Sequence, residues 1–512
     1  MDRIVRIDMT DLSARIEAIP DAWRLLGGHT LTSTVVAAEV PPASHALGPD
    51  NRLVFAPGLL TGTAAAKAGR LSVGAKSPLT GGIEQSNTGS AVARMLARLG
   101  VKALIIEGAP RQDRWYHVHM SSNAIVIEEE NELIGKGNCC LVNRVQARLG
   151  RPVGVISIGP VGEMGMLSAT LAVFGAETRL HGMGRGGLGA VMGSKRIKYI
   201  AMDDSDTPPL MPWDAAGFTE SARHFALALL DHPYSGRILP DYATRVLVEL
   251  LGETGGRRHP GRIGGERLAA HPSAIVPGRR RPLPPHGCRP DCALACAPVY
   301  DGTHRRHVAP GFEYETLWQM RDADPDTIAD CIATADHIMD DIGCDTASVA
   351  LAIAAAMNCG ALPPGDGAAV VNTLRQDIAR GTPLGRRLGD GVLFIDTPSE
   401  ALPARERRLR VATAAVDSTG ICLYIGLPAL NIPIGVSSLI GMINARFHLD
   451  LVRGDVEQQA RAALGRELRF RRAAARVTDG VQRPERYQWK APPPPAAIWD
   501  ASSEGNTSFW TF

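Results

Sequence analysis

Short runs of β-branched and apolar residues, separated by glycines and polar turns, dominate the first 200 residues of the chain. Such runs predict strands. The predicted strands are residues 32–39, 53–55, 71–75, 103–107, 124–128 and 152–158. Residues 90–99 instead have the spacing of an amphipathic helix, which Gly100 would end. The pattern predicts a β-rich base domain at residues 1–205.

The spacing of apolar positions becomes helical after residue 205. The predicted helices are residues 213–230, 242–251, 326–340, 346–357, 368–380 and 456–475. We therefore predict an α+β fold, in which the β-rich N-terminal base domain is followed by two mainly α-helical domains at residues 206–390 and 391–512. A proline-rich run at residues 490–495 begins the extended tail of the last domain.

Charge and hydropathy exclude some classes of partner. The formal net charge is +2, which gives no argument for nucleic acid or for a membrane surface. The first 20 residues carry four acidic side chains and lack the features of a signal peptide, so we expect a cytoplasmic protein. The uncharged run at residues 418–445 is interrupted by Pro428 and Pro433, which favours a buried segment over a membrane span.

Three cysteines gather within nine residues, in a stretch that prolines prevent from forming a long helix. They are Cys288, Cys292 and Cys296. Thiolates bind iron–sulfur clusters and zinc, and the best candidate for a fourth ligand is the distant Cys422. A zinc site or unligated loop cysteines would explain the same local spacing.

Two glycine-rich stretches are candidates for binding. In residues 182–195, closely spaced glycines would let backbone amides approach an anionic group, and Arg185 and Lys195 would supply charge. In residues 75–90, amides and hydroxyls in glycine-supported turns would suit a ring system rich in heteroatoms. Structural turns would account for either stretch.

One short pattern occurs twice. Asp340-Asp341-Ile342-Gly343-Cys344-Asp345 and Asp417-Ser418-Thr419-Gly420-Ile421-Cys422 share the form Asp-x-x-Gly-x-(Asp/Cys). Carboxylates at the first position can accept hydrogen bonds from N–H groups of a ligand.

These stretches together resemble the aldehyde ferredoxin oxidoreductase family of tungsten-pterin enzymes, as a shortened and divergent member. The motifs run in the family's order over most of the chain: Leu60-Thr61-Gly62-Thr63, Lys76-Ser77-Pro78-Leu79-Thr80-Gly81-Gly82, Ser86-Asn87-Thr88-Gly89, Ile158-Gly159-Pro160-Val161-Gly162-Glu163, the glycine run from Gly184 to Lys195, Glu313-Tyr314-Glu315-Thr316 and the paired Asp-x-x-Gly motifs.

The resemblance implies two pterin dithiolenes that hold tungsten or molybdenum, a magnesium ion that bridges their phosphates, and a [4Fe–4S] cluster. It implies that Cys288, Cys292, Cys296 and Cys422 bind the cluster. The residues that it places along the pterins from the base domain are Arg70, Asn87, Gly89, Arg185, Gly186, Gly187 and Gly189. Those that it places against them from the helical domains are Asp340, Gly343, Asp345, Asp417, Gly420 and Ile421.

The activity that the resemblance implies is oxidation of an aldehyde to a carboxylic acid, with ferredoxin or an iron–sulfur subunit as acceptor, in a protein that can form a homodimer. Glu313 and Glu315 are the candidates for moving the substrate's proton. The chain departs from the family where residues 392–416 are short and lack a histidine that lies beside the metal; His448, His304 and His307 are possible substitutes. There are two alternatives. One is another low-potential reduction on the same cofactor, and the other is a non-catalytic electron-relay or scaffold subunit.

Overall fold

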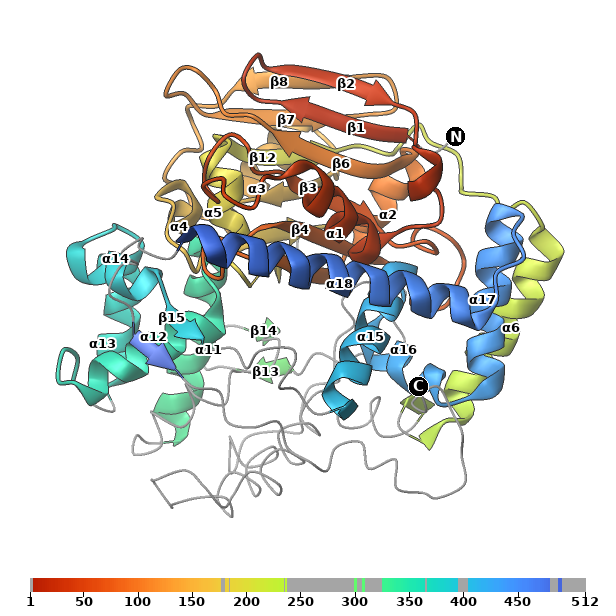
Figure 1. Ribbon diagram of the computed structural model, residues 1–512. Coiled ribbons are helices and arrows are strands. Elements are labelled where there is room, and N and C mark those ends of the chain that lie inside the picture. Colours follow the sequence, from red (N-terminus) through yellow and green to blue (C-terminus); the bar gives the residue numbers. More distant parts are fainter. Residues whose placement is uncertain are drawn as a thin grey trace.

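A computed structural model of the chain describes residues 3–175, 180–183, 185–233, 235–236, 299–301, 306–308, 325–363, 366–394, 404–478 and 487–489. Two six-stranded sheets form the N-terminal half, and helices surround the side of this base that is lower in Figure 1. This arrangement confirms the predicted α+β class, with a β-rich base followed by a helical region. The division into three domains at the predicted boundaries remains a prediction.

The first sheet has the strand order β2-β1-β6-β3-β4-β5. Its strands are β1 (Arg3–Asp8), β2 (Ser13–Glu17), β3 (Leu53–Pro57), β4 (Arg70–Lys76), β5 (Ile83–Gly89) and β6 (Val101–Glu107). β1 and β6 are parallel, and the other neighbours are antiparallel.

The second sheet repeats this topology, with the order β8-β7-β12-β9-β10-β11. Its strands are β7 (Tyr116–Met120), β8 (Ile125–Glu129), β9 (Gly154–Ser157), β10 (Leu171–Phe174), β11 (Leu180–Met183) and β12 (Ile197–Met202). Only β7 and β12 are parallel, at the place equivalent to β1 and β6. The base is therefore a structural duplication.

Helices occupy equivalent places in the two halves. α1 (Gly28–Glu39) and α3 (Asn138–Leu149) each follow the second strand of their half, and α2 (Ala91–Arg98) and α5 (Leu188–Ser194) each precede the last. α2 and α5 lie between the sheets, where their apolar side chains share one core with both of them. α1 and α3 cover the outer faces through two further cores.

The segment at residues 32–39, predicted as a strand, is helical and belongs to α1. Its threonines and valines favour strands in isolation. In the helix the hydroxyls of Thr32 and Thr34 donate to carbonyls one turn earlier, and Leu31, Val35 and Val36 are fully buried against the sheet. Tertiary packing therefore outweighs the local propensity.

Two groups of helices lie against the base. α11 (Pro325–Ile342), α12 (Thr346–Asn358), α13 (Gly367–Asn372), the π-helical turn η3 (Thr373–Ile378) and α14 (Pro383–Gly389) share one core. α6 (Ala215–Asp231), α15 (Ala404–Thr419), α16 (Leu423–Leu430) and α17 (Pro433–Phe447) share another. The predicted helix at residues 368–380 is thus divided between α13 and η3, whereas the predicted helix at residues 242–251 lies outside the described residues.

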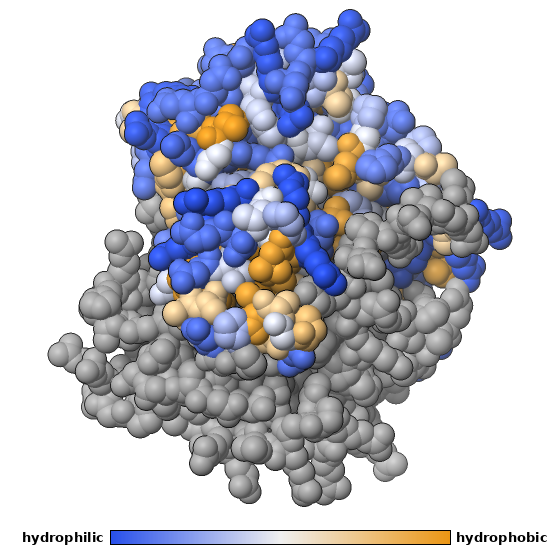
Figure 2. Space-filling view, turned by 90° about the vertical axis from the view of Figure 1, so that its left-hand side faces the viewer, coloured by the Kyte–Doolittle hydropathy of each residue, from blue (hydrophilic) through white to orange (hydrophobic). Residues whose placement is uncertain are grey.

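α18 (Arg453–Thr478) is the long helix that crosses the front of the base in Figure 1. It packs against α1 and α15, so it connects the base to the C-terminal helices. On the face shown in Figure 2, hydrophilic side chains dominate the upper, described surface, and apolar ones form small separate patches.

The remaining described elements are short. η1 (Asp21–Trp23) and α4 (Pro160–Glu163) are helical turns of the base; β13 (Val299–Asp301) pairs with β14 (Arg306–Val308), and β15 (Val392–Phe394) pairs with β16 (Tyr487–Trp489). No single helix in the described ranges is long and apolar enough to cross a membrane; α16 and α17 meet that test only as a pair, bent by 117°.

Candidate cofactor-binding site

The two Asp-x-x-Gly turns dock on equivalent places of the duplicated base. The turn after α15 forms a bridge between Ile421 and Ala68, and the turn after α11 forms one between Cys344 and Ala169. Ala68 precedes β4, and Ala169 precedes β10, which is the equivalent strand of the second sheet. The sequence repeat therefore corresponds to a repeat in space.

Backbone hydrogen bonds match between the two turns. Gly69 N donates to Gly420 O (3.1 Å), and Thr170 N, at the equivalent position, donates to Gly343 O (2.9 Å). Cys422 N donates to Lys67 O (3.2 Å). The equivalent amide is that of Asp345, which donates to Ser168 O (2.8 Å). Asp345 thus occupies in the first turn the position that Cys422 occupies in the second.

Glycine is required on both sides of each contact. A Cβ atom on Gly58 would lie 2.1 Å from Gly420 N, and one on Gly159 would lie 2.1 Å from Ile342 O. Gly420 and Gly343 have φ angles of +83° and +77°, which L residues with side chains rarely adopt. The two backbones can approach this closely only because these residues have no side chain.

Asp417 is buried, with 9% of its surface exposed, and its Oδ1 has no hydrogen-bond partner among the described residues. Burial raises the pKa of this carboxyl group, while His29 and Arg70 oppose the rise. An unpaired buried carboxylate oxygen is costly. A ligand with N–H donors would satisfy it.

Arg70 and Asn87 lie on neighbouring strands beside this turn. Arg70 Nε donates to Asn87 Oδ1 (2.5 Å), and Asn87 Nδ2 donates to Ser72 Oγ (3.0 Å). Gly89 is directly opposite Arg70 in the register of β4 and β5. The structure therefore brings together Arg70, Asn87, Gly89 and Asp417, which the sequence places in separate segments.

The first turn has its own carboxylates. Burial and the neighbouring Asp341 raise the pKa of Asp340 to about 7. Asp345 caps α12 by accepting a hydrogen bond from Ala347 N (3.2 Å), and its Oδ1 lies 3.9 Å from Arg185 Nε. Arg185 itself is 64% exposed and begins the glycine-rich segment.

The two glycine-rich stretches pack against each other. Ser77 Oγ donates to Gly186 O (2.7 Å), and a Cβ atom on Gly187 would lie 2.7 Å from a ring carbon of Pro78. Gly189 N donates to Ala169 O (3.0 Å), next to the first turn. Residues 185–189 are therefore held between residues 76–78 and the start of β10.

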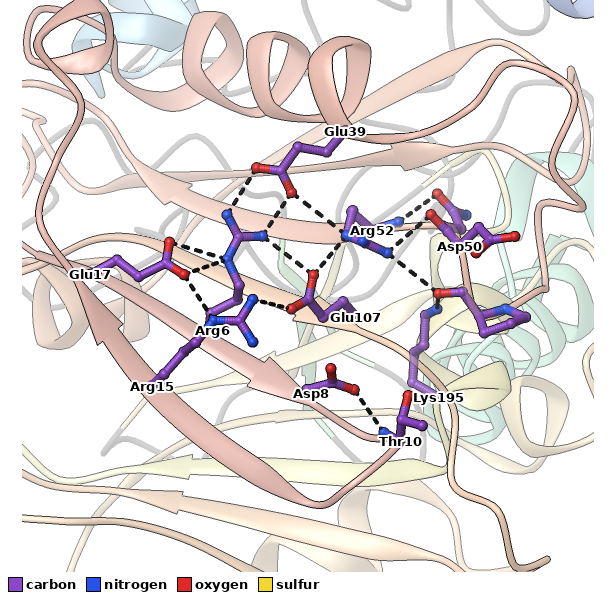
Figure 3. A network of polar contacts seen from close by, with 12 residues as sticks. Arg6, Asp8, Thr10, Arg15, Glu17, Glu39, Asp50, Arg52, Glu107 and Lys195 are labelled. Atoms are coloured by element: carbon purple, nitrogen blue, oxygen red, sulfur yellow. Dashed lines mark hydrogen bonds and ion pairs between the residues drawn. The ribbon is translucent and has the colours of Figure 1, made fainter.

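Lys195 does not supply charge to this loop. It is fully buried, and its Nζ donates to Gly48 O (3.0 Å) and Pro49 O (3.1 Å). Figure 3 shows the Lys195 side chain near Asp50. Burial lowers its pKa to about 7. The expectation that Lys195 faces an anion together with Arg185 is therefore wrong, because the side chain fixes residues 48–49 instead.

The predicted cluster is only partly described. Cys422 is half-buried at the start of α16, whereas Cys288, Cys292 and Cys296 lie outside the described residues, as do Glu313 and Glu315. Within the described part of the chain, no group of three or more His, Cys, Asp or Glu side chains could hold a metal ion. His448 is exposed at the end of α17, where its ring lies against Trp213.

Sequence reasoning missed His29. Its Nε2 lies 2.8 Å from Glu467 Oε1, and both side chains are largely buried. Ser33 Oγ also donates to Glu467, and Gln85 Nε2 donates to Ser33 Oγ (2.8 Å). The available signal was the Gly27-Gly28 pair immediately before His29, since adjacent glycines often mark a close backbone approach.

The structure thus combines a duplicated β base with two equivalent docking contacts for two similar aspartate–glycine turns. Two family models match this chain: "Aldehyde ferredoxin oxidoreductase, N-terminal domain" over residues 4–204, and "Aldehyde ferredoxin oxidoreductase, domains 2 & 3" over residues 228–400. The chain belongs to the aldehyde ferredoxin oxidoreductase family.

Its curated relatives include tungsten-containing aldehyde ferredoxin oxidoreductases. The chain is 30% identical to those of Pyrococcus furiosus, over 366 residues, and Thermococcus kodakarensis, over 372 residues. Each match covers 69% of this chain and 58% of the relative, so the chain spans less than two thirds of these relatives.

A solved structure shares the fold. The active site complex BamBC of benzoyl coenzyme A reductase, in complex with 1,5-dienoyl-CoA, matches with a TM-score of 0.74 at 16% identity. The match covers 92% of this chain and 89% of that chain.

Proposed function

We propose that this protein is a tungsten or molybdenum bis-pterin, iron–sulfur oxidoreductase that oxidises an aldehyde to a carboxylic acid. The observation that carries the proposal is the pair of equivalent Asp-x-x-Gly turns on a duplicated base. One turn holds a buried carboxylate oxygen that has no hydrogen-bond partner among the described residues. Family membership supplies the cofactor class, and the duplication supplies two similar binding faces for two similar ring systems.

The residues around each turn fit a pterin. Asp417 would accept hydrogen bonds from pterin N–H groups, and Arg70, Asn87 and Gly89 would line the same pterin from the base. Gly420 and Ile421 would present backbone groups to it. When bound, the metal and its dithiolenes would supply the two-electron redox chemistry, while the protein positions the cofactor and excludes water.

The first turn would serve the other pterin. Asp340 and Asp345 would contact the ring from the helical side, with Gly343 between them. Residues Arg185, Gly186, Gly187 and Gly189 would approach from the base, and the cation of Arg185 would favour the phosphate. A magnesium ion at the phosphates would complete the proposed cofactor.

The same duplication accounts for the position of Cys422, the proposed fourth cluster ligand. Cys422 takes the position of Asp345 in the second turn, so it would hold the proposed [4Fe–4S] cluster on the side of that turn. Cys288, Cys292 and Cys296 would provide the other thiolates. Electrons would leave through this cluster to ferredoxin or to an iron–sulfur subunit.

Glu313 and Glu315 are the proposed proton-handling residues. A carboxylate in an enclosed site has a raised pKa and can take the proton that the aldehyde substrate loses on oxidation. Glu313→Gln and Glu315→Gln should each lower kcat by about 100-fold or more. Unchanged turnover in both variants would remove these residues from the proposal and favour the relay subunit.

Elemental analysis of anaerobically purified protein tests the proposal. We expect tungsten or molybdenum and the iron of one [4Fe–4S] cluster in each chain, with aldehyde-dependent reduction of an acceptor dye. Zinc without iron would contradict the cluster, and a protein with neither pterin nor metal would contradict the assignment as a whole.

A second candidate is a low-potential reduction of an activated ring. The observation in its favour is the fold, which this chain shares with the benzoyl coenzyme A reductase structure over 92% of its length. Incubation of the loaded protein with a panel of aldehydes and with aromatic acyl-CoA thioesters separates the two. Turnover of thioesters without turnover of aldehydes would select the reduction.

A further inference from the structure

His29 and Glu467 form a nearly buried pair that connects α1 with α18. The His29 and Glu467 side chains are 12% and 19% exposed, and the atoms that face each other are 2.8 Å apart. Burial opposes a charge on the imidazole, but the attraction of Glu467 outweighs it and raises the pKa of His29. Glu467 therefore favours the charged form of His29.

The first turn of α1 lies directly on the backbone of the second Asp-x-x-Gly turn. A Cβ atom on Gly28 would lie 2.3 Å from Asp417 O, and one on Gly27 would lie 2.8 Å from Ser418 O. Thr30 N donates to Ser418 Oγ (3.1 Å). The two segments are therefore in direct contact, and the charge of His29 interacts with the Asp417 carboxylate.

His29 and Arg70 are the two cations that lower the pKa of Asp417 against the effect of burial. Arg70 is already engaged with Asn87 through two hydrogen bonds. The Asp340 carboxyl group in the first turn experiences burial and the negative Asp341 instead. The two turns share a backbone geometry but differ in the charges around their aspartates.

We propose that His29, held in place by Glu467, is a positioning residue that keeps the Asp417 carboxylate ionised and ready to accept the N–H groups of the pterin in the second turn. This inference rests on the proposed function. It deepens that function by assigning to the pterin site of the second turn a residue that controls the ionisation of its aspartate. His29 touches neither substrate nor metal in this account.

Several other charged groups lie around this pair. Arg471 faces it from α18, Asp417 from α15 and Glu84 from β5, while Arg70 on β4 faces Asp417. As pH falls toward the range in which carboxylates titrate, His29 is fully charged. It therefore supports Asp417 in the pH range where Asp417 would otherwise take up a proton.

The test measures the pH at which holoprotein releases its pterin, read by the fluorescence of free pterin and by metal content. We expect His29→Gln to raise the release midpoint by about one pH unit, because the loss of a nearby cation shifts a carboxyl pKa by about that much or more. His29→Lys restores a cation and should return the midpoint toward that of the wild type.

His117→Gln is the matched control. His117 is a buried histidine of the second sheet that stacks on Tyr199 and lies 3.5 Å from Glu130. Its substitution removes the same buried ring, but one whose pKa burial lowers, from another part of the base. We expect no change in the release midpoint, although thermal stability can fall.

The Asp417→Asn background shows whether His29 acts through Asp417. In that background, His29→Gln should cause no further shift of the midpoint. Infrared difference spectra of the holoproteins give a second readout, in which the protonated Asp417 band should appear at higher pH in His29→Gln than in the wild type. The inference about His29 would be overturned if the midpoint and the band of His29→Gln equalled those of the wild type. It would also be overturned if the shift of the midpoint persisted in the Asp417→Asn background; neither outcome would affect the proposed function. Wild-type protein without pterin would overturn the proposed function as well.

Discussion

Gly420 shows how a single residue allows the second turn to dock on the base. Its φ angle is +83°, and a Cβ atom there would lie 2.3 Å from Thr61 Oγ1 and 3.0 Å from Gly58 Cα. Gly81 also has a positive φ angle, of +72°, but nothing lies within 4 Å of its Cβ position. Substitution of the two glycines therefore distinguishes the cost of backbone strain, which both positions would have, from the cost of steric overlap, which only Gly420 would have.

Gly420→Ala should destabilise the protein by about 2–4 kcal/mol, since the strain of a left-handed residue adds to the cost of overpacking. Gly81→Ala should cost only the strain, about 1–2 kcal/mol. Urea unfolding followed by circular dichroism measures both. Equal costs in the two variants would show that Gly420 is not in tight contact with residues 58–61.

Asp340 gives a pH dependence whose sign can be worked out. Its folded pKa of about 7 lies above the unfolded value, so the folded state binds the extra proton between about pH 4 and pH 7. The contribution of Asp340 to stability is therefore favourable below the unfolded pKa and is lost as pH rises through the folded value.

Asp340→Asn in cofactor-free protein should therefore be more stable than the wild type at pH 8, by about 1–3 kcal/mol, and no more stable at pH 4. Thermal melting across this pH range measures the difference. A gain that is the same at both pH values would contradict a raised pKa for Asp340.

At the scale of elements, ion pairs join the edge of the first sheet to α1. Glu107 of β6 is nearly buried and contacts Arg6 (3.4 Å), Arg15 (2.6 Å) and Arg52 (2.9 Å), and Arg6 also contacts Glu39 of α1 (2.7 Å), as Figure 3 shows. The arrangement connects β1, β2, β6 and α1. If one buried charge of this network is removed, the charges that faced it remain buried without an opposite charge.

Glu107→Gln should lower the free energy of unfolding by about 3 kcal/mol, because it removes the charge that faces three guanidinium groups. Asp21→Asn is the control, since Asp21 is 90% exposed and its pair with Arg24 should contribute about 0–1 kcal/mol. Chemical unfolding of both variants tests this. A similar small cost for both would show that the network around Glu107 is not coupled.

The sequence predicts some of these elements and misses others for physical reasons. The predicted strands at residues 53–55, 71–75 and 103–107 are confirmed as β3, β4 and β6 because each is a short apolar run between turns. Residues 32–39 were assigned to a strand because their β propensity is high, and only their burial against the sheet makes them helical. β1 and β2 went unrecognised because charged residues interrupt them.

At the scale of the whole molecule, the duplication explains why the Asp-x-x-Gly repeat was visible in the sequence. Gly343 and Gly420 fill the same role in two copies of one contact, so the same residue types recur. His29, in contrast, does not belong to a repeated sequence motif. Its link to Glu467 spans 438 positions of the chain, and no local pattern predicts a pairing at that distance.

The convergence of the four cysteines remains a prediction, because Cys288, Cys292 and Cys296 lie outside the described residues. The arrangement of the two turns is described, and it supports the central claim that one centre is bound from two equivalent sides. That claim requires two pterins for each metal atom.

The ratio of pterin to tungsten plus molybdenum in anaerobically purified protein tests this claim most directly. Acid release of pterin and mass spectrometry of the metals give the two quantities from one sample. A ratio of two is expected. A ratio of one in the wild type, or metal without pterin, would contradict a centre held by both turns.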